Sequence, residues 1–206
     1  MIQKCGLVAV LGAPNAGKST LVNALVGEKV AIVSPKAQTT RARLMGIAIE
    51  GEAQLLLVDT PGIFEPHRRL DRAMVAAAWE GAESADRTLL VVDAAAKIGA
   101  RVENVLKGIE GRPEPLILVL NKVDLAKKDD LLVRAQELSN RLNPEAVFMI
   151  AASTGDGVAD LKKYLAAAMP EGPWHFPGDQ LSDSTDRMVA AEITRERAPG
   201  RSTRPA

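Results

Sequence analysis

The chain has 206 residues with 26 basic and 26 acidic side chains, so its formal net charge is zero. This length is typical of one globular domain with a short appendage, and the balanced charge excludes the broad basic field that marks many nucleic-acid-binding proteins. The single cysteine, Cys5, excludes an intrachain disulfide and fits a reducing cytoplasm, where we expect it as a small buried thiol.

The N-terminal part of the chain combines a predicted strand, a glycine-rich loop and a predicted helix. Residues 5–11 form an apolar run too short to span a membrane, and residues 18–27 have a helical pattern that ends at a glycine. The stretch that joins them fits the phosphate-binding pattern G-x-x-x-x-G-K-[ST]: Gly12-Ala13-Pro14-Asn15-Ala16-Gly17-Lys18-Ser19. The alternative, a glycine-rich turn that binds nothing, does not explain the flanking strand and helix.

Phosphate binding by this loop would follow from its backbone. The glycines let successive N–H groups turn inward toward a phosphate, and the start of the helix adds partial positive charge. Lys18 is expected to reach the β- and γ-phosphates, and the hydroxyl of Ser19 is expected to bind Mg²⁺.

The next segments predict a loop and a strand hairpin that ends in an acidic motif. Residues 28–41 have no clear period and are predicted to be a mobile loop, whereas residues 43–50 and 53–58 are predicted strands. Their connection, Gly51-Glu52, is so short that the two strands must be antiparallel. The motif Asp59-Thr60-Pro61-Gly62 follows, where a carboxylate can hold Mg²⁺ through a water and a glycine N–H can approach a γ-phosphate. Taken alone, this motif could also be a plain turn after a strand.

The rest of the chain alternates predicted strands and helices. A second loop at 60–70 and a helix at 71–82 come first; strands at 87–93, 115–121 and 146–150 then alternate with helices at 99–109, 128–142 and 158–169. The helix at 128–142 is expected to bury one apolar face, made of Leu131, Leu132, Ala135 and Leu138. Most strands are continuous apolar runs, as expected where helices cover both faces of a parallel sheet. We therefore predict a doubly wound α/β fold with a mostly parallel six-stranded sheet and one antiparallel edge strand.

A polar motif, Asn121-Lys122-Val123-Asp124, follows the strand at 115–121. Because ligands bind at the carboxyl ends of the strands in such a sheet, this motif should lie near the phosphate-binding loop. Asp124 offers two acceptor oxygens to two neighbouring N–H donors, which the edge of guanine has and that of adenine lacks. Asn121 can bond the base or brace the phosphate-binding loop, and the stem of Lys122 can cover a ring face.

The composition changes after Pro170. Residues 170–178 are rich in proline and glycine and are predicted to be an extended linker, in which Trp174 packs onto the preceding domain. Residues 181–196 could begin a helix, and residues 197–206 are expected to be disordered because they cannot form a core.

Together the motifs resemble the G domain of the translation-factor-related GTPases and, within these, the bacterial ribosome-assembly GTPases of the Era family. The resemblance extends from residue 1 to about 196 and is carried by four stretches: Gly12 to Ser19, Gln38-Thr39-Thr40-Arg41, Asp59-Thr60-Pro61-Gly62-Ile63 and Asn121-Lys122-Val123-Asp124. It implies a P-loop GTPase that binds GTP and GDP with Mg²⁺. It also implies a part in 16S rRNA processing and in assembly of the small (30S) ribosomal subunit.

The resemblance assigns a role to each matching residue. Gly12 to Thr20 wrap the phosphates, and Asn121, Lys122 and Asp124 select guanine, while Ala152 offers its backbone N–H to the guanine oxygen. Ser19 and a switch threonine bind Mg²⁺, either Thr40 or its neighbour Thr39, and Asp59 is a carboxylate that acts on the metal through water. The catalytic groups implied are Lys18, Gly62 and Asn15, of which Asn15 holds a monovalent cation, K⁺, near the phosphates.

Three features depart from the family pattern. The base-binding loop has Ala151-Ala152 where the family has Ser-Ala, so a hydroxyl is missing while the backbone contact at Ala152 survives. Ile63 cannot orient an attacking water as a glutamine does, so slow intrinsic hydrolysis is expected. No G-x-x-G clamp of an RNA-binding KH domain follows the linker, so the chain is expected to be truncated before that domain.

These points divide the chain into a G domain at 1–170, a linker with the start of the missing KH domain at 171–196, and an atypical tail at 197–206. The leading hypothesis is a GTPase switch in which the loops at 28–41 and 60–70 respond to the γ-phosphate. The alternative is a guanine-nucleotide-binding module with little hydrolysis and no RNA binding; a P-loop kinase is disfavoured by the motif at 121–124. We expect a monomer in the cytoplasm. The resemblance allows a peripheral association with the inner membrane, but no basic amphipathic helix supports one.

Overall fold

A computed structural model of the protein describes residues 2–28, 44–59, 85–113 and 115–179. Most of the predicted loop at 28–41, the loop at 60–70, the helix at 71–82, the segment at 181–196 and the tail at 197–206 lie outside these residues.

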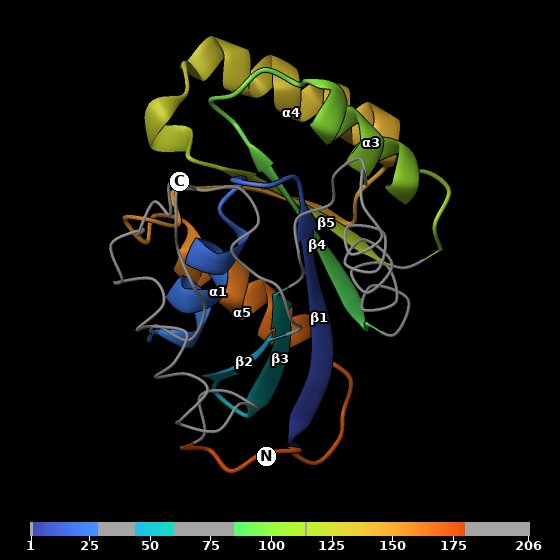
Figure 1. The fold of residues 1–206 in the computed structure, drawn as a ribbon. Helices are drawn as coiled ribbons and strands as arrows, with labels where there is room; N and C mark the ends of the chain where they lie inside the picture. The colour runs from blue at the N-terminus through green and yellow to red at the C-terminus, as the bar shows by residue number, and fades with distance from the viewer. Residues whose placement is uncertain (1, 29–43, 60–84, 114, 180–206) are drawn as a thin grey trace, which may run out of the picture.

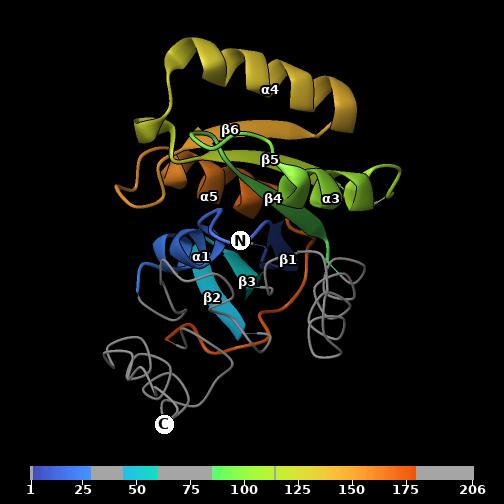
Figure 2. The ribbon, with the colours of Figure 1, turned by 45° about the horizontal axis from the view of Figure 1, so that its top comes forward.

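The described residues contain a six-stranded sheet with the strand order β2-β3-β1-β4-β5-β6 (Figure 1 and Figure 2). Its strands are β1 (Lys4–Gly12), β2 (Leu44–Glu50), β3 (Ala53–Asp59), β4 (Arg87–Asp93), β5 (Leu116–Asn121) and β6 (Ala146–Ile150). The edge strand β2 runs antiparallel to β3, and the other described pairs are parallel. This confirms the predicted doubly wound sheet with one antiparallel edge strand.

Helices cover the sheet from both sides (Figure 2). They are α1 (Lys18–Val26), α3 (Ala100–Ile109), α4 (Lys128–Leu142) and α5 (Val158–Ala168), with a short 3₁₀ turn, η1 (Val123–Leu125). Residues of α1 and α5 share one buried cluster with Val8 and Val10 of β1, whereas α3 and α4 share another with Ala9 and Leu11. This split follows from the strand itself, because successive side chains point to opposite faces of a sheet.

The predicted end of the first helix is confirmed in detail. Gly27 follows the last residue of α1 with a left-handed φ of 91°, and its N–H donates to the carbonyl of Asn23 at 2.9 Å. Glycine adopts this conformation without the steric cost that a Cβ would bring, so the helix ends where the sequence changes to glycine.

One expectation about the packing was wrong. Leu132 is 63% exposed, since the buried face of α4 consists of Leu131, Ala135, Leu138 and Leu142; a helix turns by about 100° per residue, which carries Leu132 away from that face. The strand β6 is less covered than the central strands, since Val147 and Met149 are each 37% exposed. Like β2, β6 lies at an edge of the sheet, with a neighbouring strand on one side alone, so its apolar residues are less covered than those of the central strands.

Residues 170–179, here called the strap, pack against the start of β1 and against β3. The carbonyl of Pro170 accepts the N–H of Cys5 at 3.1 Å, and the N–H of Gly172 donates to the carbonyl of Gln3 at 3.0 Å. This edge of β1 is available because β4 pairs with β1 from Val8 onward. The strap thus continues the sheet for a short distance at its amino-terminal end.

The side chain of Gln54 ties the strap to β3. It is fully buried, and its amide Nε2 donates to the carbonyl of Phe176 at 2.8 Å. Its Oε1 accepts the N–H groups of His175 at 2.9 Å and Phe176 at 3.1 Å. Trp174 and Phe176 pack on Cys5 in a third buried cluster, and Trp174 Nε1 donates to the carbonyl of Glu52 at 3.0 Å. The predicted packing of Trp174 on the domain is therefore confirmed.

Replacing Gln54 by leucine is expected to lower the free energy of unfolding by about 2–3 kcal/mol, because the backbone groups of the strap lose buried partners. Urea unfolding measures this change. A second measurement is the labelling rate of Cys5, a residue that is 8% exposed and whose pKa is raised by burial. Both properties slow its reaction with alkylating reagents, so release of the strap should speed labelling. Gln136→Leu, at an exposed position of α4, is the control; equal stability and labelling of the two variants would contradict the role given to Gln54.

Candidate functional site

The loop between β1 and α1 has the backbone that its sequence predicts. Asn15 and Gly17 lie in the left-handed region, with φ of 65° and 95°. A Cβ at Gly17 would stand 2.2 Å from Nδ2 of Asn121, and one at Gly12 would stand 2.4 Å from the carbonyl oxygen of Val91. Such distances are far below van der Waals contact, so both glycines are required by their neighbours as well as by the turn.

Lys18 lies inside this loop. Its ammonium donates to the carbonyls of Gly12 at 3.2 Å and Ala13 at 3.0 Å, and the residue is only 7% exposed. A buried cation needs nearby acceptors, and here the loop itself supplies them. The side chain is thus held at the centre of the loop, within reach of any phosphate that the loop encloses.

Asn121 connects the end of β5 to the phosphate-binding loop. It is 2% exposed, its Nδ2 donates to the carbonyl of Ala16 at 2.9 Å, and its Oδ1 accepts the N–H of Ala152 at 3.0 Å. Of the two roles that the sequence left open, the structure gives Asn121 the bracing one. The N–H of Ala152, predicted to donate to a guanine oxygen, donates to Asn121, so that contact remains a prediction that requires sharing or exchange of this bond.

Lys122 makes a second brace beside the first. Its ammonium donates to the carbonyl of Asn15 at 2.8 Å and to Oδ2 of Asp93 at 2.6 Å. Sequence reasoning missed Asp93, although a signal existed: like Asp59, it is an aspartate at the carboxyl end of a buried strand. Two successive residues of the motif thus hold two successive carbonyls of the loop, those of Ala16 and Asn15.

The other predicted site residues that the structure describes lie near the phosphate-binding loop or follow Lys122 in the chain. β1 and β3 are parallel, with Val10 beside Asp59, so β3 ends next to the start of the loop. Ser19 and Thr20 are in the first turn of α1, and Asp124 is exposed in η1 while Val123 packs on the core. Thr40, Thr60, Pro61, Gly62 and Ile63 are outside the described residues, as is the side chain of Asp59.

The loop after β6, which carries Ala151 and Ala152, is closed by its own backbone. The N–H of Ala151 donates to the carbonyl of Asp156 at 3.0 Å, and its carbonyl accepts the N–H groups of Thr154 at 3.1 Å and Gly155 at 2.9 Å. The hydroxyl of Thr154 donates to the same carbonyl at 3.1 Å. These bonds order the loop without the serine hydroxyl that Ala151 lacks.

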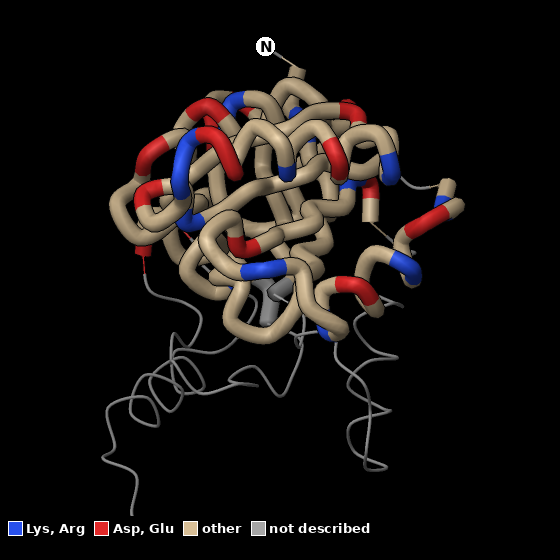
Figure 3. Tube along the Cα trace, turned by 90° about the horizontal axis from the view of Figure 1, so that it is seen from above, with Lys and Arg blue, Asp and Glu red and all other residues tan. Residues whose placement is uncertain are grey.

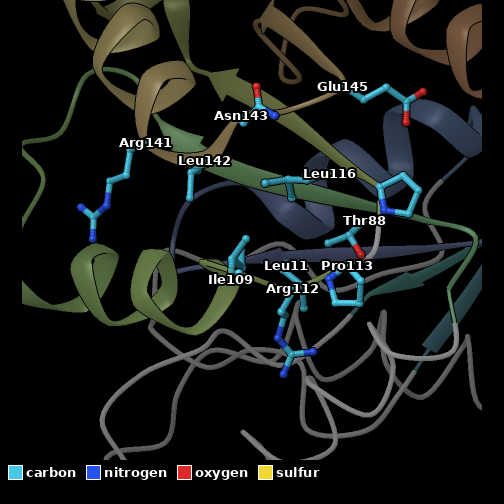
Figure 4. A pocket seen from close by; sticks show the side chains of 12 residues that line it. Leu11, Thr88, Ile109, Arg112, Pro113, Leu116, Arg141, Leu142, Asn143 and Glu145 are labelled. Atoms are coloured by element: carbon cyan, nitrogen blue, oxygen red, sulfur yellow. The ribbon is translucent and has the colours of Figure 1, made fainter.

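Two hollows help to locate the site. One of about 160 Å³ lies behind the phosphate-binding loop and is lined by Ala13, Pro14, Asn15, Ala16 and residues of β4 and α3. A larger one, about 520 Å³, lies where α3 and α4 end (Figure 4). Thr88 lines it, and this buried hydroxyl has no hydrogen-bond partner among the described residues.

The larger hollow is not where the predicted site residues gather. Thr88 and Leu116 line it from the amino-terminal ends of β4 and β5, whereas ligands of doubly wound folds bind at the carboxyl ends. Its charged side chains are also engaged, since Arg141 pairs with Glu103 and Glu110, and Glu145 with Arg87. The phosphate-binding loop is therefore the candidate site.

Comparison with known proteins agrees with this geometry. Residues 7–122 match a family described as "50S ribosome-binding GTPase". The GTPase Era of Erythrobacter litoralis (strain HTCC2594) is 61% identical over 199 residues, which cover 95% of this chain and 66% of that protein. The GTPase Era of Maricaulis maris (strain MCS10) is 52% identical, with 95% of this chain and 67% of that protein covered. This chain belongs to the Era family of GTPases.

The fold of Era is also matched by solved structures. A crystal structure of Era in complex with MgGDPNP and nucleotides 1506-1542 of 16S ribosomal RNA superimposes with a TM-score of 0.86 at 39% identity, covering 94% of this chain and 66% of that one. The chain thus spans about two thirds of the length of the Era proteins it matches. Among the described residues, no helix is long and apolar enough to cross a membrane.

Proposed function

We propose that the chain is a guanine-nucleotide-binding switch that hydrolyses GTP to GDP and phosphate. The observation that carries the proposal is the double brace of Asn121 and Lys122, whose side chains bond the carbonyls of Ala16 and Asn15. These bonds join the motif that we propose reads the base to the loop that we propose binds the phosphates. Membership of the Era family supports the same activity.

The phosphate end of the site would act through backbone N–H groups and Lys18. In a planar trans peptide, the carbonyl of one residue and the N–H of the next point in opposite directions. By holding the carbonyl of Ala16, Asn121 aims the N–H of Gly17 away from itself, toward the inside of the loop. Together with the ammonium of Lys18 and the start of α1, such donors stabilise negative charge on a phosphate before and during transfer.

Magnesium fits the oxygen donors on this side of the site. We propose that the hydroxyls of Ser19 and Thr40 bind it, with Asp59 acting through water. Hard oxygen ligands of this kind suit Mg²⁺, which usually keeps several waters and binds the phosphates of its nucleotide. Among the described residues, no group of three or more His, Cys, Asp or Glu side chains is placed so that it could hold a metal ion. Bound Mg²⁺ would neutralise charge on the phosphates during hydrolysis.

Guanine would be selected by Asp124. Its two carboxylate oxygens can accept N1–H and the 2-amino group of guanine, a pair of donors that adenine lacks. Asp124 is exposed in η1, two residues after Lys122, so it can meet a ligand without displacing the core. The left-handed φ of 65° at Lys122 turns the chain sharply between the bracing residue and the base-reading one.

Hydrolysis is proposed to be slow and to depend on K⁺. Ile63 cannot orient a water molecule, so we assign catalysis to Lys18, to the N–H of Gly62 and to a K⁺ ion held by Asn15. A second candidate function is a guanine-nucleotide-binding module that hydrolyses very little GTP. The same apolar Ile63 favours it. In either case the proposed location is the cytoplasm and the proposed state is a monomer.

A role in ribosome assembly is proposed from the relatives. The solved Era complex contains part of 16S ribosomal RNA, and we propose that the whole protein acts on this RNA and on the 30S subunit. The described G domain itself has interspersed positive and negative residues (Figure 3). Such a mixture does not favour non-specific binding of RNA by these residues, and so we assign RNA contacts to parts of the whole protein outside them.

Phosphate release from GTP with Mg²⁺, measured in KCl and again in NaCl, tests the proposal. We expect steady release in KCl, slower release in NaCl, and competition by GDP but not by ADP. No release in either salt, with GDP still bound, would leave the binding module as the function. Equal competition by ADP would overturn the assignment of guanine.

A further inference from the structure

Asp93 joins three segments around the phosphate-binding loop. It is the last residue of β4 and lies in register with Asn121 of β5. Its Oδ1 accepts the N–H groups of Ala95 at 2.9 Å and Ala96 at 3.1 Å, which closes a turn after the strand. Its Oδ2 accepts the ammonium of Lys122 at 2.6 Å. Both carboxylate oxygens are therefore engaged, one by the local backbone and one by the guanine motif.

The contact between Asp93 and Lys122 is partly shielded from water. The two side chains are 20% and 31% exposed. Charge-assisted hydrogen bonds are stronger than neutral ones, and shielding reduces their screening by solvent and salt. A lysine stem is long and flexible, so without the carboxylate its ammonium would have many other positions available. The carboxylate thus selects the rotamer in which the same ammonium reaches the carbonyl of Asn15 at 2.8 Å.

Asp93 is itself held in place by two neighbouring elements. Arg134 of α4 donates through Nη1 to the carbonyl of Asp93 at 3.2 Å and to that of Ala94 at 2.5 Å. The N–H of Ala94 donates to the carbonyl of Asn121 at 2.7 Å. The end of β4 is therefore fixed to both α4 and β5, and Asp93 can act as a rigid support.

Through Lys122, Asp93 supports an uncommon backbone conformation at Asn15. Asn15 has a φ of 65°, a left-handed conformation that is uncommon outside glycine, although asparagine tolerates it better than most residues do. Its carbonyl bond to Lys122 is one constraint on this conformation, and the neighbouring bond from Asn121 to Ala16 is another. Loss of the first constraint would loosen the loop and the lysine stem together.

We propose that Asp93 is a positioning residue for guanine-nucleotide binding, acting through Lys122 on the carbonyl of Asn15. This inference rests on the proposed function, since it assumes that the loop binds the phosphates of a guanine nucleotide. Asp93 does not touch the nucleotide; it sets the shape of the loop and keeps the stem of Lys122 on the side of the base.

Asp93→Asn isolates this role. The amide keeps Oδ1 as an acceptor for the turn, but Nδ2 replaces Oδ2 and cannot accept from the ammonium of Lys122. We expect the Kd for GDP to rise about tenfold, mainly through faster dissociation, as for loss of one charge-assisted hydrogen bond. Calorimetry gives the Kd, and displacement of a fluorescent GDP analogue gives the dissociation rate.

A double-mutant cycle separates positioning from a general structural effect. In a Lys122→Met background, Asp93→Asn should change the Kd for GDP by less than about twofold, because the partner of the carboxylate is already absent. Asp130→Asn, at an exposed position of α4, makes the same charge change and should bind GDP as the wild type does. If circular dichroism shows that the Asp93→Asn protein is unfolded, Asp93→Ser replaces it in the cycle. The serine hydroxyl can still accept the N–H groups of the turn, those of Ala95 and Ala96.

The outcomes are distinguishable. If the wild type does not bind GDP, the proposed function itself fails. If the wild type binds GDP and the Asp93 variant binds equally tightly, the positioning role is overturned. It is also overturned if the losses in the two single variants simply add in the double variant. A loss in the Asp93 variant that disappears in the Lys122→Met background supports it.

Discussion

Replacing Asp124 by asparagine is expected to shift the preference of the site from GDP to xanthosine diphosphate (XDP). The ratio of the two affinities should change by roughly a thousandfold, because a site built on hydrogen bonds strongly rejects a mismatched partner. An asparagine presents one acceptor and one donor where the aspartate presents two acceptors. Guanine would place its 2-amino group against the new donor, whereas xanthine has a carbonyl there that accepts it. Calorimetric titration of wild type and variant with each diphosphate measures the shift.

The position of Asp124 makes this substitution interpretable. The side chain is exposed in η1 and is nearly isosteric with asparagine, so the core is not disturbed. Asp129→Asn, exposed on the neighbouring α4, is a matched control and should keep the preference for GDP. An Asp124→Asn protein that still prefers GDP, or that binds neither nucleotide while remaining folded, would show that the carboxylate does not read the base.

Much of the fold could be predicted because local signals and tertiary packing agree. Continuous apolar runs bounded by turn residues mark β1, β4 and β5, and all their residues except those at the ends are buried or nearly so. The short turn before β3 required an antiparallel partner, which β2 is. Leu132 was assigned wrongly because a run of adjacent leucines does not reveal which of them faces the sheet.

The site was predictable where its residues are contiguous in the sequence and less so where they meet through the fold. The loop at 12–19 and the motif at 121–124 are short patterns with known chemistry. Whether Asn121 bonds the base or braces the loop depends on a contact with Ala16, which lies 105 positions away in the sequence. The parallel arrangement of the strands creates this contact. Asp93 belongs to no motif; its partnership with Lys122 follows from the register of β4 and β5.

The same register explains how one side of the candidate site is joined to the sheet. β1, β4 and β5 end together, and the side chains of Asp93, Asn121 and Lys122 link these ends to the phosphate-binding loop. A loop held in this way need not reorganise when it binds phosphate, and preorganised donors are the most effective ones for stabilising charge. We therefore expect the largest losses from variants that remove a donor from inside the loop.

Lys18→Ala is expected to weaken GDP binding by roughly a thousandfold, because it removes a buried positive charge from the phosphate end of the site. It also leaves the carbonyls of Gly12 and Ala13 without the ammonium that bonds them. Equilibrium titration with fluorescent GDP measures the loss, and thermal unfolding without nucleotide shows whether the fold persists. Lys18→Met keeps the apolar stem and should weaken GDP binding to the same extent. Lys163→Ala, on the exposed surface of α5, should leave the affinity for GDP unchanged. A Lys18→Met protein that binds GDP within a few-fold of the wild type would mean that phosphates are held elsewhere.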